Sequence, residues 1–564
     1  MNSPTRPTFN LLHQPWIPVR PADGGPVREV GLRELLLRAS EFGRIDDPSP
    51  LVTVALLRLS LALLHRALRG PKNAEQAAEW FQGDFPAEKL EEYFREWEDS
   101  FDLFHPEKPF WQLRGLTLEL EGGKYRSHWT RLGTEVGSAN TLPLFNVAGR
   151  PGGERVDSLT PAEAARRLVE GQTFLLGGLI QRFTTAAKAA PVATFALTAA
   201  QGQNLHKTLC LSLVGYAGQD DDQAVWEREP LTVEAVRLYH DDGRADVPRG
   251  RADRYTWPSR SVLLVPEEDE NSAVRVTSIG FAAGIPLDGP PEGAGSNIDP
   301  MVTLRPPSNP KKPELFPLKL RREQLLWRDL SALLPDPQND LRVAGKPGQE
   351  DFQRISGHPP GTLTHAREVL DYAGMGEQHL GVTVTGLLSK EGKAFAYRQE
   401  SYALPSVFVS DAETFVTYVN RALDDAKGIG EALQKATARL ATEVISRGGE
   451  SALLKNPQEA KKTVDRLVQT LPGLGAFWAA LETPFRVFLA ELDAPQDARN
   501  RWQAAVSREA RRAWEINLQG AGGDGQVLGF AYRPRRSDGK YQPSPQAILD
   551  RALKVINPAQ EANT

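Results

Sequence analysis

The spacing of hydrophobic positions changes near Leu404 and predicts two kinds of architecture. From Asp411 onward, apolar residues recur at helical intervals, and Asp411 itself is a favourable N-terminal cap. The segments predicted to be helical are 411–446, 459–471, 474–492, 495–518 and 545–556. Since Leu471-Pro472-Gly473 could break one helix into two, we expect a bundle of about four antiparallel helices.

Before Leu404 the pattern is mixed. Residues 51–70 form the most apolar run, but Arg58, His65 and Arg66 interrupt it, so it predicts a buried helix rather than a membrane span. Shorter helices are predicted at 30–39, 87–99 and 161–170, extended segments at 9–19 and 382–396, and an irregular stretch at 217–300. The sequence therefore predicts an α+β protein, with a large mixed α/β N-terminal domain (residues 1–403) followed by a C-terminal four-helix bundle (residues 404–564).

The stretch 137–191 stands out within the first domain. Residues 142–147 are an apolar knot inside a polar, Gly- and Pro-rich segment, which is typical of an exposed loop that docks onto a partner. Gly177-Gly178 then precede the cations Arg182 and Lys188. A glycine pair beside cations lets a nucleic-acid backbone approach closely, although a packed turn between buried segments would read the same way.

Composition limits the partners. The net charge is −5, so the 564-residue chain is not a globally basic nucleic-acid binder, and any such contact must come from local patches. The single cysteine, Cys210, excludes a disulfide framework and a Cys-based zinc site, as expected for a reducing cytoplasm. The first ten residues have no apolar core of signal-peptide type.

Catalytic signatures are missing from the sequence, which contains no Walker loop, HExxH, GxSxG or clustered Cys and His. His240-Asp241-Asp242 could ligate a metal but is more typical of an acidic surface turn. Gly520, Gly522 and Gly525 form a GxGxxG that follows a predicted helix instead of a strand. We therefore expect neither an enzyme nor a metal or cofactor. The alternative is a metal-dependent nuclease or nucleotide-dependent enzyme that uses these acidic and glycine clusters.

Two groups of arginines mark the predicted bundle. Arg501, Arg508 and Arg512 share one helix face at i, i+7 and i+11, and a basic loop follows the glycine run with Arg533, Arg535 and Arg536. Such cations could contact phosphates or a partner protein, or simply be solvated.

Several stretches, taken in order, resemble the CasA family, the large subunit of the type I-E CRISPR surveillance complex (Cascade). They are NLLHQPWIPV (10–19), the leucine helix (51–70), WEDSFDLFHPEKPFWQ (97–112), GSANTLPLFN (137–146) and PVATF (191–195). The resemblance implies a non-catalytic, cytoplasmic protein of antiviral defence. It would recognise the protospacer-adjacent motif (PAM) on duplex DNA, promote R-loop formation and recruit the helicase-nuclease, in keeping with a protein that reads a short motif while the guide RNA reads the rest.

The same resemblance implies partners and site residues. The partners are a CRISPR guide RNA, target double-stranded DNA, the 5′-handle-capping subunit, the small-subunit dimer and the helicase-nuclease, with no membrane. The loop that docks on the RNA assembly matches Leu144, Phe145 and Asn146, and the glycine loop at the PAM falls near Gly177 and Gly178.

The strand-separating wedge of the family falls on the turn 389–393. No glutamine stands at its tip, where Lys390, Glu391, Gly392 and Lys393 occur instead. The family's lysine finger would fall at 280–286, where this chain has no lysine. We therefore expect Lys390 and Lys393 to hold DNA phosphates in place of a glutamine wedge.

Overall fold

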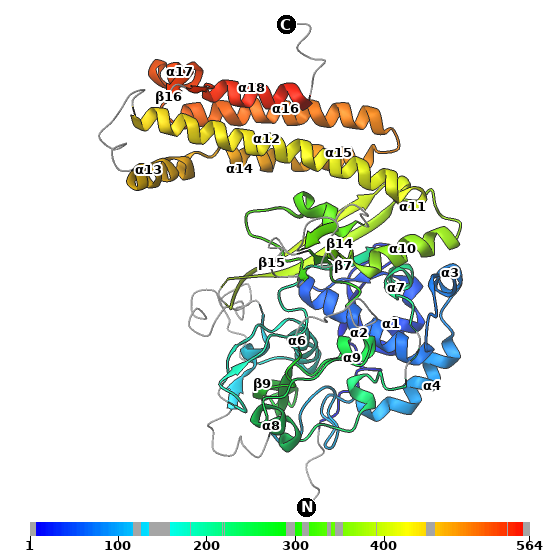
Figure 1. The fold of residues 1–564 in the computed structure, drawn as a ribbon. Helices are drawn as coiled ribbons and strands as arrows, with labels where there is room; N and C mark the ends of the chain where they lie inside the picture. Colours follow the sequence, from blue (N-terminus) through cyan, green and yellow to red (C-terminus); the bar gives the residue numbers. More distant parts are fainter. Residues whose placement is uncertain are drawn as a thin grey trace, which may run out of the picture. The chain divides into compact units, whose positions relative to one another are not determined.

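A computed structural model describes most of the chain in two compact units. The described residues are 7–116, 126–134, 158–180, 182–216, 218, 220–288, 299–306, 315–334, 340–343, 353–390, 392–446, 457–537 and 540–556. One unit comprises Met1–Leu326 and Ala332–Tyr402, and the other comprises Trp327–Ser331 and Ala403–Thr564. The first mixes helices with several small sheets and the second is largely helical (Figure 1), which confirms the predicted α+β class.

The first unit is built around helix α2 (Pro50–Leu68), which starts with proline in its first turn and ends where Arg69 takes a left-handed conformation. It packs against α6 and α9. Within the described part of the chain it is the one helix long and apolar enough to cross a membrane, but 83% of its apolar window is buried in the protein. This confirms the predicted core helix.

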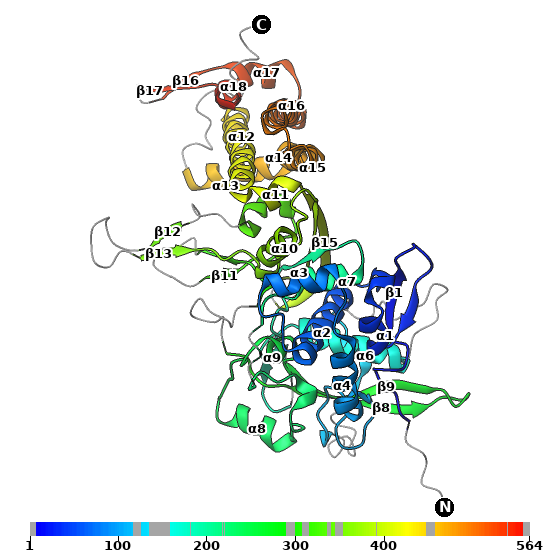
Figure 2. The ribbon, with the colours of Figure 1, turned by 90° about the vertical axis from the view of Figure 1, so that its right-hand side faces the viewer.

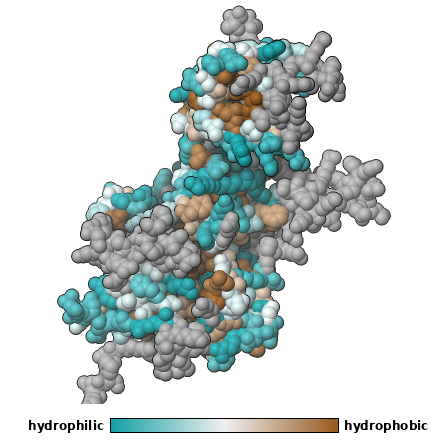
Figure 3. Space-filling model, turned by 90° about the vertical axis from the view of Figure 1, so that its left-hand side faces the viewer, coloured by the Kyte–Doolittle hydropathy of each residue, from teal (hydrophilic) through white to brown (hydrophobic). Residues whose placement is uncertain are grey.

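On the face shown in Figure 3, hydrophilic side chains are interspersed with small hydrophobic patches.

Shorter helices surround α2. The α-helices of this unit are α1 (Leu32–Leu37), α3 (Ala74–Gln82), α4 (Ala87–Trp97), α6 (Pro161–Phe174), α7 (Leu205–Ser212), α8 (Val233–Asp241), α9 (Arg251–Tyr255) and α10 (Gly361–Tyr372). Its short 3-10 helices are η1 (Ala39–Glu41), η2 (Glu98–Phe101), η4 (Trp129–Leu132) and η5 (Val225–Glu227).

Three antiparallel sheets of three strands each complete the described frame, in the orders β2-β1-β3, β4-β9-β8 and β15-β14-β7. Their strands are β1 (Ile17–Pro21), β2 (Arg28–Val30), β3 (Phe42–Ile45), β4 (Arg126–His128), β7 (Leu197–Gln201), β8 (Arg260–Glu268), β9 (Val274–Ala283), β14 (Leu380–Lys390) and β15 (Lys393–Leu404). Two-stranded pairs are β5 (Gly178–Leu179) with β6 (Ala186–Ala187), β10 (Leu304–Arg305) with β11 (Phe316–Pro317), and β12 (Asp340–Val343) with β13 (Gln353–Ser356).

The stretch 217–300 is more regular than the sequence suggested. Strands β8 and β9 run side by side to a common tip (Figure 2), with Leu264 opposite Ile279 in their register. The prediction of an irregular segment was wrong here because Pro266 interrupts the alternation of β8, and the ladder absorbs this interruption as a shift in register after Val265.

The second unit has the long helices α12 (Ala412–Ser446) and α16 (Pro495–Gly520), which pack against each other (Figure 1). The remaining elements are α11 (Ser406–Ser410), α13 (Pro457–Thr470), α14 (Gly473–Ala480), α15 (Glu482–Ala490), α17 (Gly525–Tyr532), α18 (Pro545–Ile556), β16 (Arg535–Ser537) and β17 (Lys540–Gln542). The predicted helix 474–492 is divided at Leu481, since Pro484 has no N–H to continue the hydrogen-bond ladder.

One core side chain of this helical unit comes from far upstream. Trp327, in the 3-10 helix η6 (Leu326–Leu333), is fully buried. Its ring centroid lies 5.0 Å from that of Phe485 and 6.1 Å from that of Trp502. The indole of Trp502 in turn donates a hydrogen bond to the carbonyl of Ala422 (3.0 Å). An early segment of the chain therefore completes the aromatic core of the helical unit.

Candidate nucleic-acid interface

The glycine pair lies on a small hairpin, residues 176–188, which we call the glycine hairpin. It follows α6, whose start is fixed by a capping box between Thr160 and Glu163. Strands β5 and β6 form a two-residue ladder in which Gly178 pairs with Ala187 and Leu179 with Ala186. Leu179 is 88% exposed. The sequence-predicted loop is thus a short turn that projects an apolar side chain.

The two glycines have different surroundings. A β-carbon on Gly177 would lie 2.9 Å from both the Ala187 carbonyl oxygen and the Ala189 nitrogen, which leaves no room for a side chain. A β-carbon on Gly178 would have no neighbour within 4 Å. Packing inside the protein therefore accounts for Gly177, whereas Gly178 leaves its backbone open to an approaching molecule.

The cations predicted near this hairpin also differ. Lys188 is exposed, and its Nζ donates a hydrogen bond to the carbonyl of Leu287 (2.9 Å). Arg182 is 4% exposed, and its guanidinium lies over the ring of Phe183 at 5.2 Å from the centroid. Lys188 can therefore meet a ligand, whereas Arg182, which lies between β5 and β6 in the sequence, is buried and is not accessible in this structure.

The predicted wedge is the turn between β14 and β15, and we call residues 390–393 the β14–β15 tip. Gly392 has φ +75°, a left-handed conformation that favours glycine. Lys390 and Lys393 flank the turn, both are exposed, and neither forms an ion pair with any described residue. Glu391 lies outside the described residues. The tip therefore presents two exposed cations on a narrow turn.

These two hairpins, far apart in sequence, share one cleft. It is lined by Gly177, Gly178, Gly392 and Lys393. Arg131 of η4 also lines it, is exposed, and stacks at 5.4 Å on the ring of Phe281. Sequence reasoning missed Arg131, since a single arginine in a short irregular segment carries no local signature. The cleft thus combines an open backbone at Gly178 with cations from η4 and β15.

Arg260 closes the inner side of the cleft from the first residue of β8. It is buried, and burial lowers the pKa of its guanidinium to about 10, which leaves it charged at neutral pH. Sequence reasoning missed this residue as well, because its contacts are made with segments more than seventy positions away.

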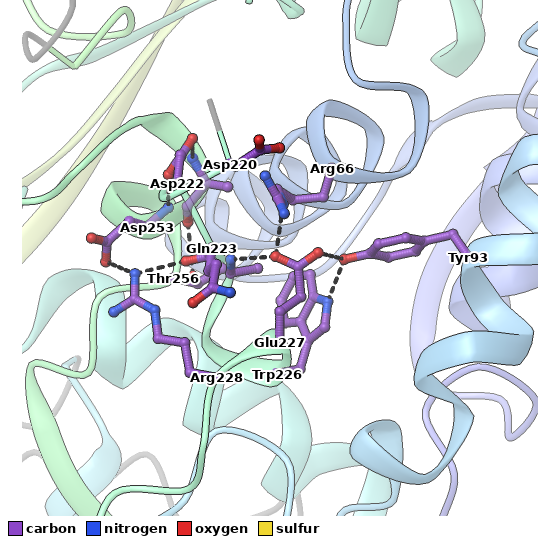
Figure 4. Close-up of polar contacts among 12 residues, drawn as sticks. Arg66, Tyr93, Asp220, Asp222, Gln223, Trp226, Glu227, Arg228, Asp253 and Thr256 are labelled. Carbon is purple, nitrogen blue, oxygen red and sulfur yellow. Dashed lines mark hydrogen bonds and ion pairs between the residues drawn. The ribbon is translucent and has the colours of Figure 1, made fainter. Parts of the chain in front are cut away.

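Within the acidic run 220–222, Asp222 has a structural role. Its side chain is fully buried, and its polar contacts are drawn in Figure 4. Its carboxylate accepts hydrogen bonds from the backbone N–H groups of Ala252 (3.0 Å) and Asp253 (2.8 Å) and from the hydroxyl of Tyr216 (2.9 Å). It therefore caps the N-terminus of α9.

A second buried carboxylate, Glu227, ties this segment to α2 and α4 (Figure 4). It accepts from Arg66 Nε (2.7 Å), the Tyr93 hydroxyl (2.7 Å) and the backbone N–H of Ala224 (2.8 Å). The Tyr93 oxygen also accepts from the indole of Trp226 (2.8 Å). All of these groups hold the fold together, so the network leaves no free carboxylate for a ligand.

The other features behind the enzyme alternative also have structural roles. His240 Nε2 lies 2.9 Å from the carbonyl oxygen of Gly284, and Asp242 pairs with Arg244 at 2.9 Å. The GxGxxG connects α16 to α17, where Asp524 caps the second helix. In the described ranges no group of three His, Cys, Asp or Glu side chains could hold a metal.

The basic residues of the helical unit are mostly on its surface. Arg501, Arg508 and Arg512 are exposed on α16, where Arg501 bonds to Glu491 and Arg508 to Glu509, both at 2.8 Å. Arg533 is exposed after α17, and Arg535 and Arg536 lie on β16. The docking-loop residues Leu144, Phe145 and Asn146 lie outside the described residues.

Comparison with known proteins identifies relatives over almost the whole chain. Residues 10–513 match the family described as CRISPR-associated protein Cse1. The CRISPR-associated protein CasA/Cse1 of Thermus thermophilus is 36% identical over 519 residues, covering 90% of this chain and 92% of that protein.

Solved structures agree. The crystal structure of CasA from Thermus thermophilus matches with TM-score 0.75 at 31% identity, covering 98% of this chain and 99% of that one. Cse1 from Acidimicrobium ferrooxidans matches with TM-score 0.71 at 25% identity, covering 98% and 99%. A chain of a CRISPR RNA-guided surveillance complex shares the fold, with TM-score 0.68 at 19% identity and coverage of 98% and 99%.

Proposed function

Because this chain belongs to the Cse1 (CasA) family of CRISPR-associated proteins, we propose that it is the non-catalytic large subunit of a type I-E RNA-guided surveillance complex. In this role it recognises the PAM on duplex DNA, promotes local opening of the duplex and R-loop formation, and recruits the helicase-nuclease in antiviral defence. The guide RNA reads the remaining sequence of the target.

The observation that carries this proposal is the shared cleft of the glycine hairpin and the β14–β15 tip. Gly178 has an open backbone, and Arg131 and Lys393 line the same cleft. A backbone without a side chain can enter the minor groove, where A·T and T·A pairs present similar acceptors, while the cations contact phosphates. This arrangement favours tolerant reading of a short duplex motif beside a turn that separates the strands.

The cations of the two hairpins act by charge and position. Lys390 and Lys393 hold the phosphates of the parted strands while the turn occupies the gap, because unstacking a base step costs about a few kcal/mol that contacts must offset. Lys188 lies on the same hairpin as Gly178 and extends the basic surface. These contacts position the duplex and carry no base information.

The remaining partners and their contact residues are part of the same proposal. The loop with Leu144, Phe145 and Asn146 docks the protein on the guide RNA and the 5′-handle-capping subunit. The arginines Arg501, Arg508, Arg512, Arg533, Arg535 and Arg536 offer a basic surface of the helical unit to DNA, the small-subunit dimer or the helicase-nuclease.

A single substitution tests the reading of DNA. Gly178→Val meets open space, so it should leave the fold intact, whereas Gly177→Val would clash with Ala187 and Ala189. The complex assembled with Gly178→Val should incorporate guide RNA normally and bind a PAM-containing duplex more weakly than the complex with the native chain. Equal binding would show that the glycine hairpin does not meet the PAM.

The enzyme alternative needs a separate measurement. Purified chain is incubated with labelled duplex in the presence and absence of Mg²⁺ or Mn²⁺. Binding without cleavage in both conditions supports the proposal. Metal-dependent cleavage that follows the chain through purification would replace the proposal with a nuclease.

A further inference from the structure

Arg260 joins both ends of the glycine hairpin with one guanidinium. Its Nη2 donates to the carbonyl oxygens of Leu176 (2.7 Å) and Leu175 (3.3 Å), which precede Gly177. Its Nη1 donates to the carbonyl oxygen of Lys188 (2.9 Å), at the other end of the hairpin, and to that of Ser259 (2.7 Å). The side chain therefore bridges the point where the chain enters the hairpin and the point where it leaves.

The backbone of Arg260 is fixed as well. The side-chain amide of Gln172, in the last turn of α6, accepts from the Arg260 N–H (2.9 Å) and donates to the Arg260 carbonyl (2.8 Å). Hence α6, β8 and the glycine hairpin are coupled through two neighbouring polar side chains. A guanidinium can donate hydrogen bonds to several carbonyl oxygens at once because its N–H groups form a rigid planar fork, which a lysine ammonium lacks.

Burying the charged guanidinium of Arg260 costs free energy. Arg260 is 4% exposed and forms no ion pair with a described carboxylate, so carbonyl dipoles alone stabilise its charge. Among its described residues, the hairpin has few internal hydrogen bonds: a two-residue ladder, a backbone bond from Ile180 N–H to the Thr185 carbonyl (3.2 Å) and a bond from the Thr184 hydroxyl to the Ala186 carbonyl (3.4 Å). Links to neighbouring segments run from Ala190 N–H to the Leu175 carbonyl (2.8 Å), from Ala283 N–H to the Arg182 carbonyl (3.5 Å) and from Lys188 Nζ to the Leu287 carbonyl (2.9 Å). So short a hairpin has little stability of its own.

We propose that Arg260 is a positioning residue for DNA recognition: it holds the glycine hairpin at a fixed place beside the β14–β15 tip, so that Gly178 meets the duplex already ordered. The inference rests on the proposed function. A preordered hairpin binds more tightly because its ordering entropy is not lost on binding.

The test compares Arg260→Met with Arg251→Met. Arg251 is a matched control, since it is also largely buried and donates to backbone carbonyls, those of Val214 and Gly215, away from the hairpin. Hydrogen exchange of the free protein should rise about tenfold or more in residues 177–188 for Arg260→Met and stay unchanged there for Arg251→Met. Unchanged exchange in Arg260→Met would overturn the proposal.

A double-mutant cycle then links the anchor to DNA. Arg260→Met should weaken PAM-duplex binding by the assembled complex about tenfold, and much of this loss should disappear in a Gly178→Val background, because both changes act through the same hairpin. Fully additive losses would overturn the positioning role. If Gly178→Val alone has no effect on DNA binding while Arg260→Met still loosens the hairpin, the proposed function fails and the anchor stands as a structural feature.

Arg260→Lys keeps the test decisive if Arg260→Met does not fold. The ammonium keeps the charge but cannot reach both ends of the hairpin, so it should preserve the melting temperature better than methionine and still raise exchange in residues 177–188. Native exchange and native DNA affinity in Arg260→Lys would show that charge, and not the bridge between the ends, is what matters.

Discussion

A β-carbon built on Gly392 would lie 3.8 Å from the carbonyl oxygen of Gly177. The β14–β15 tip and the glycine hairpin thus lie next to each other at these two glycines. This distance is an ordinary van der Waals contact, so a lack of space for a side chain does not explain why residue 392 is a glycine. Its φ of +75° does, because this conformation is unfavourable for residues with a side chain.

Gly392→Ala should therefore strain the tip by about 1 kcal/mol without a clash. We expect the rate or the extent of duplex opening next to the PAM to decrease while complex assembly is unchanged. The opening is followed with 2-aminopurine fluorescence. Gly374→Ala is a matched control, since Gly374 also has positive φ (+68°) and open space but lies outside the cleft. Equal opening in Gly392→Ala and the native protein would contradict a role for the tip geometry.

The lysines of the tip should act without regard to sequence. Lys390→Ala combined with Lys393→Ala should weaken binding to all permitted PAMs alike and reduce the slope of log affinity against log salt by about 2, one unit for each phosphate that is no longer neutralised. Lys72→Ala with Lys89→Ala removes two exposed lysines elsewhere in the unit and should do neither. A changed PAM preference with intact opening would mean that the tip lysines read bases.

The docking loop makes a separate prediction about assembly. Replacing Phe145 and Asn146 by alanine should abolish incorporation into the guide RNA complex, because the apolar knot and the amide are the contacts that we propose for that interface. The melting temperature should stay nearly unchanged. Size-exclusion chromatography with the remaining subunits measures the outcome, and normal incorporation would refute this assignment.

Glu227 should matter for stability and not for DNA. Glu227→Gln leaves the buried Arg66 guanidinium without its charged partner (2.7 Å), so we expect a loss of about 3 kcal/mol in the free energy of unfolding of the first unit. Glu229→Gln, at an exposed neighbouring position, should have little effect. Denaturant unfolding followed by tryptophan fluorescence distinguishes the two, and equal stabilities would mean that the Arg66 pair contributes little.

Two buried histidines predict how stability depends on pH. Burial lowers the pKa of His65 to about 3 and that of His365 to about 4, against about 6.5 in an unfolded chain. Between these values the unfolded chain binds more protons, so lowering the pH from 7 to 5 should reduce the free energy of unfolding by about 2 kcal/mol for each histidine.

His65→Gln removes the titratable imidazole and should flatten this dependence by one histidine's share. Unfolding curves measured at half-unit pH steps provide the comparison. A His65→Gln profile parallel to that of the native chain would show that His65 is not kept neutral by the fold.

How far the sequence reaches can be judged from individual residues. The leucine run of α2 and the helical spacing after Asp411 are local patterns, and both predicted the right elements. Gly177 and Gly178 are indistinguishable in sequence, and only the position of Ala187 separates a packed glycine from an open one. Arg260 gives no signal because its acceptors are carbonyl oxygens, which every residue carries. The role of Arg260 at the base of the glycine hairpin could therefore be recognised only from the three-dimensional structure.

Trp327 has a consequence for how such a protein can evolve. The sequence predicts a helical module that starts at residue 404, yet the helical unit takes an aromatic side chain from a position 77 residues before that start. A gene fusion or recombination event at this boundary would deliver a bundle with a tryptophan-sized hole beside Phe485 and Trp502. The two units are thus expected to be inherited together, and exchanging the helical unit between relatives requires the segment Trp327–Ser331 to travel with it.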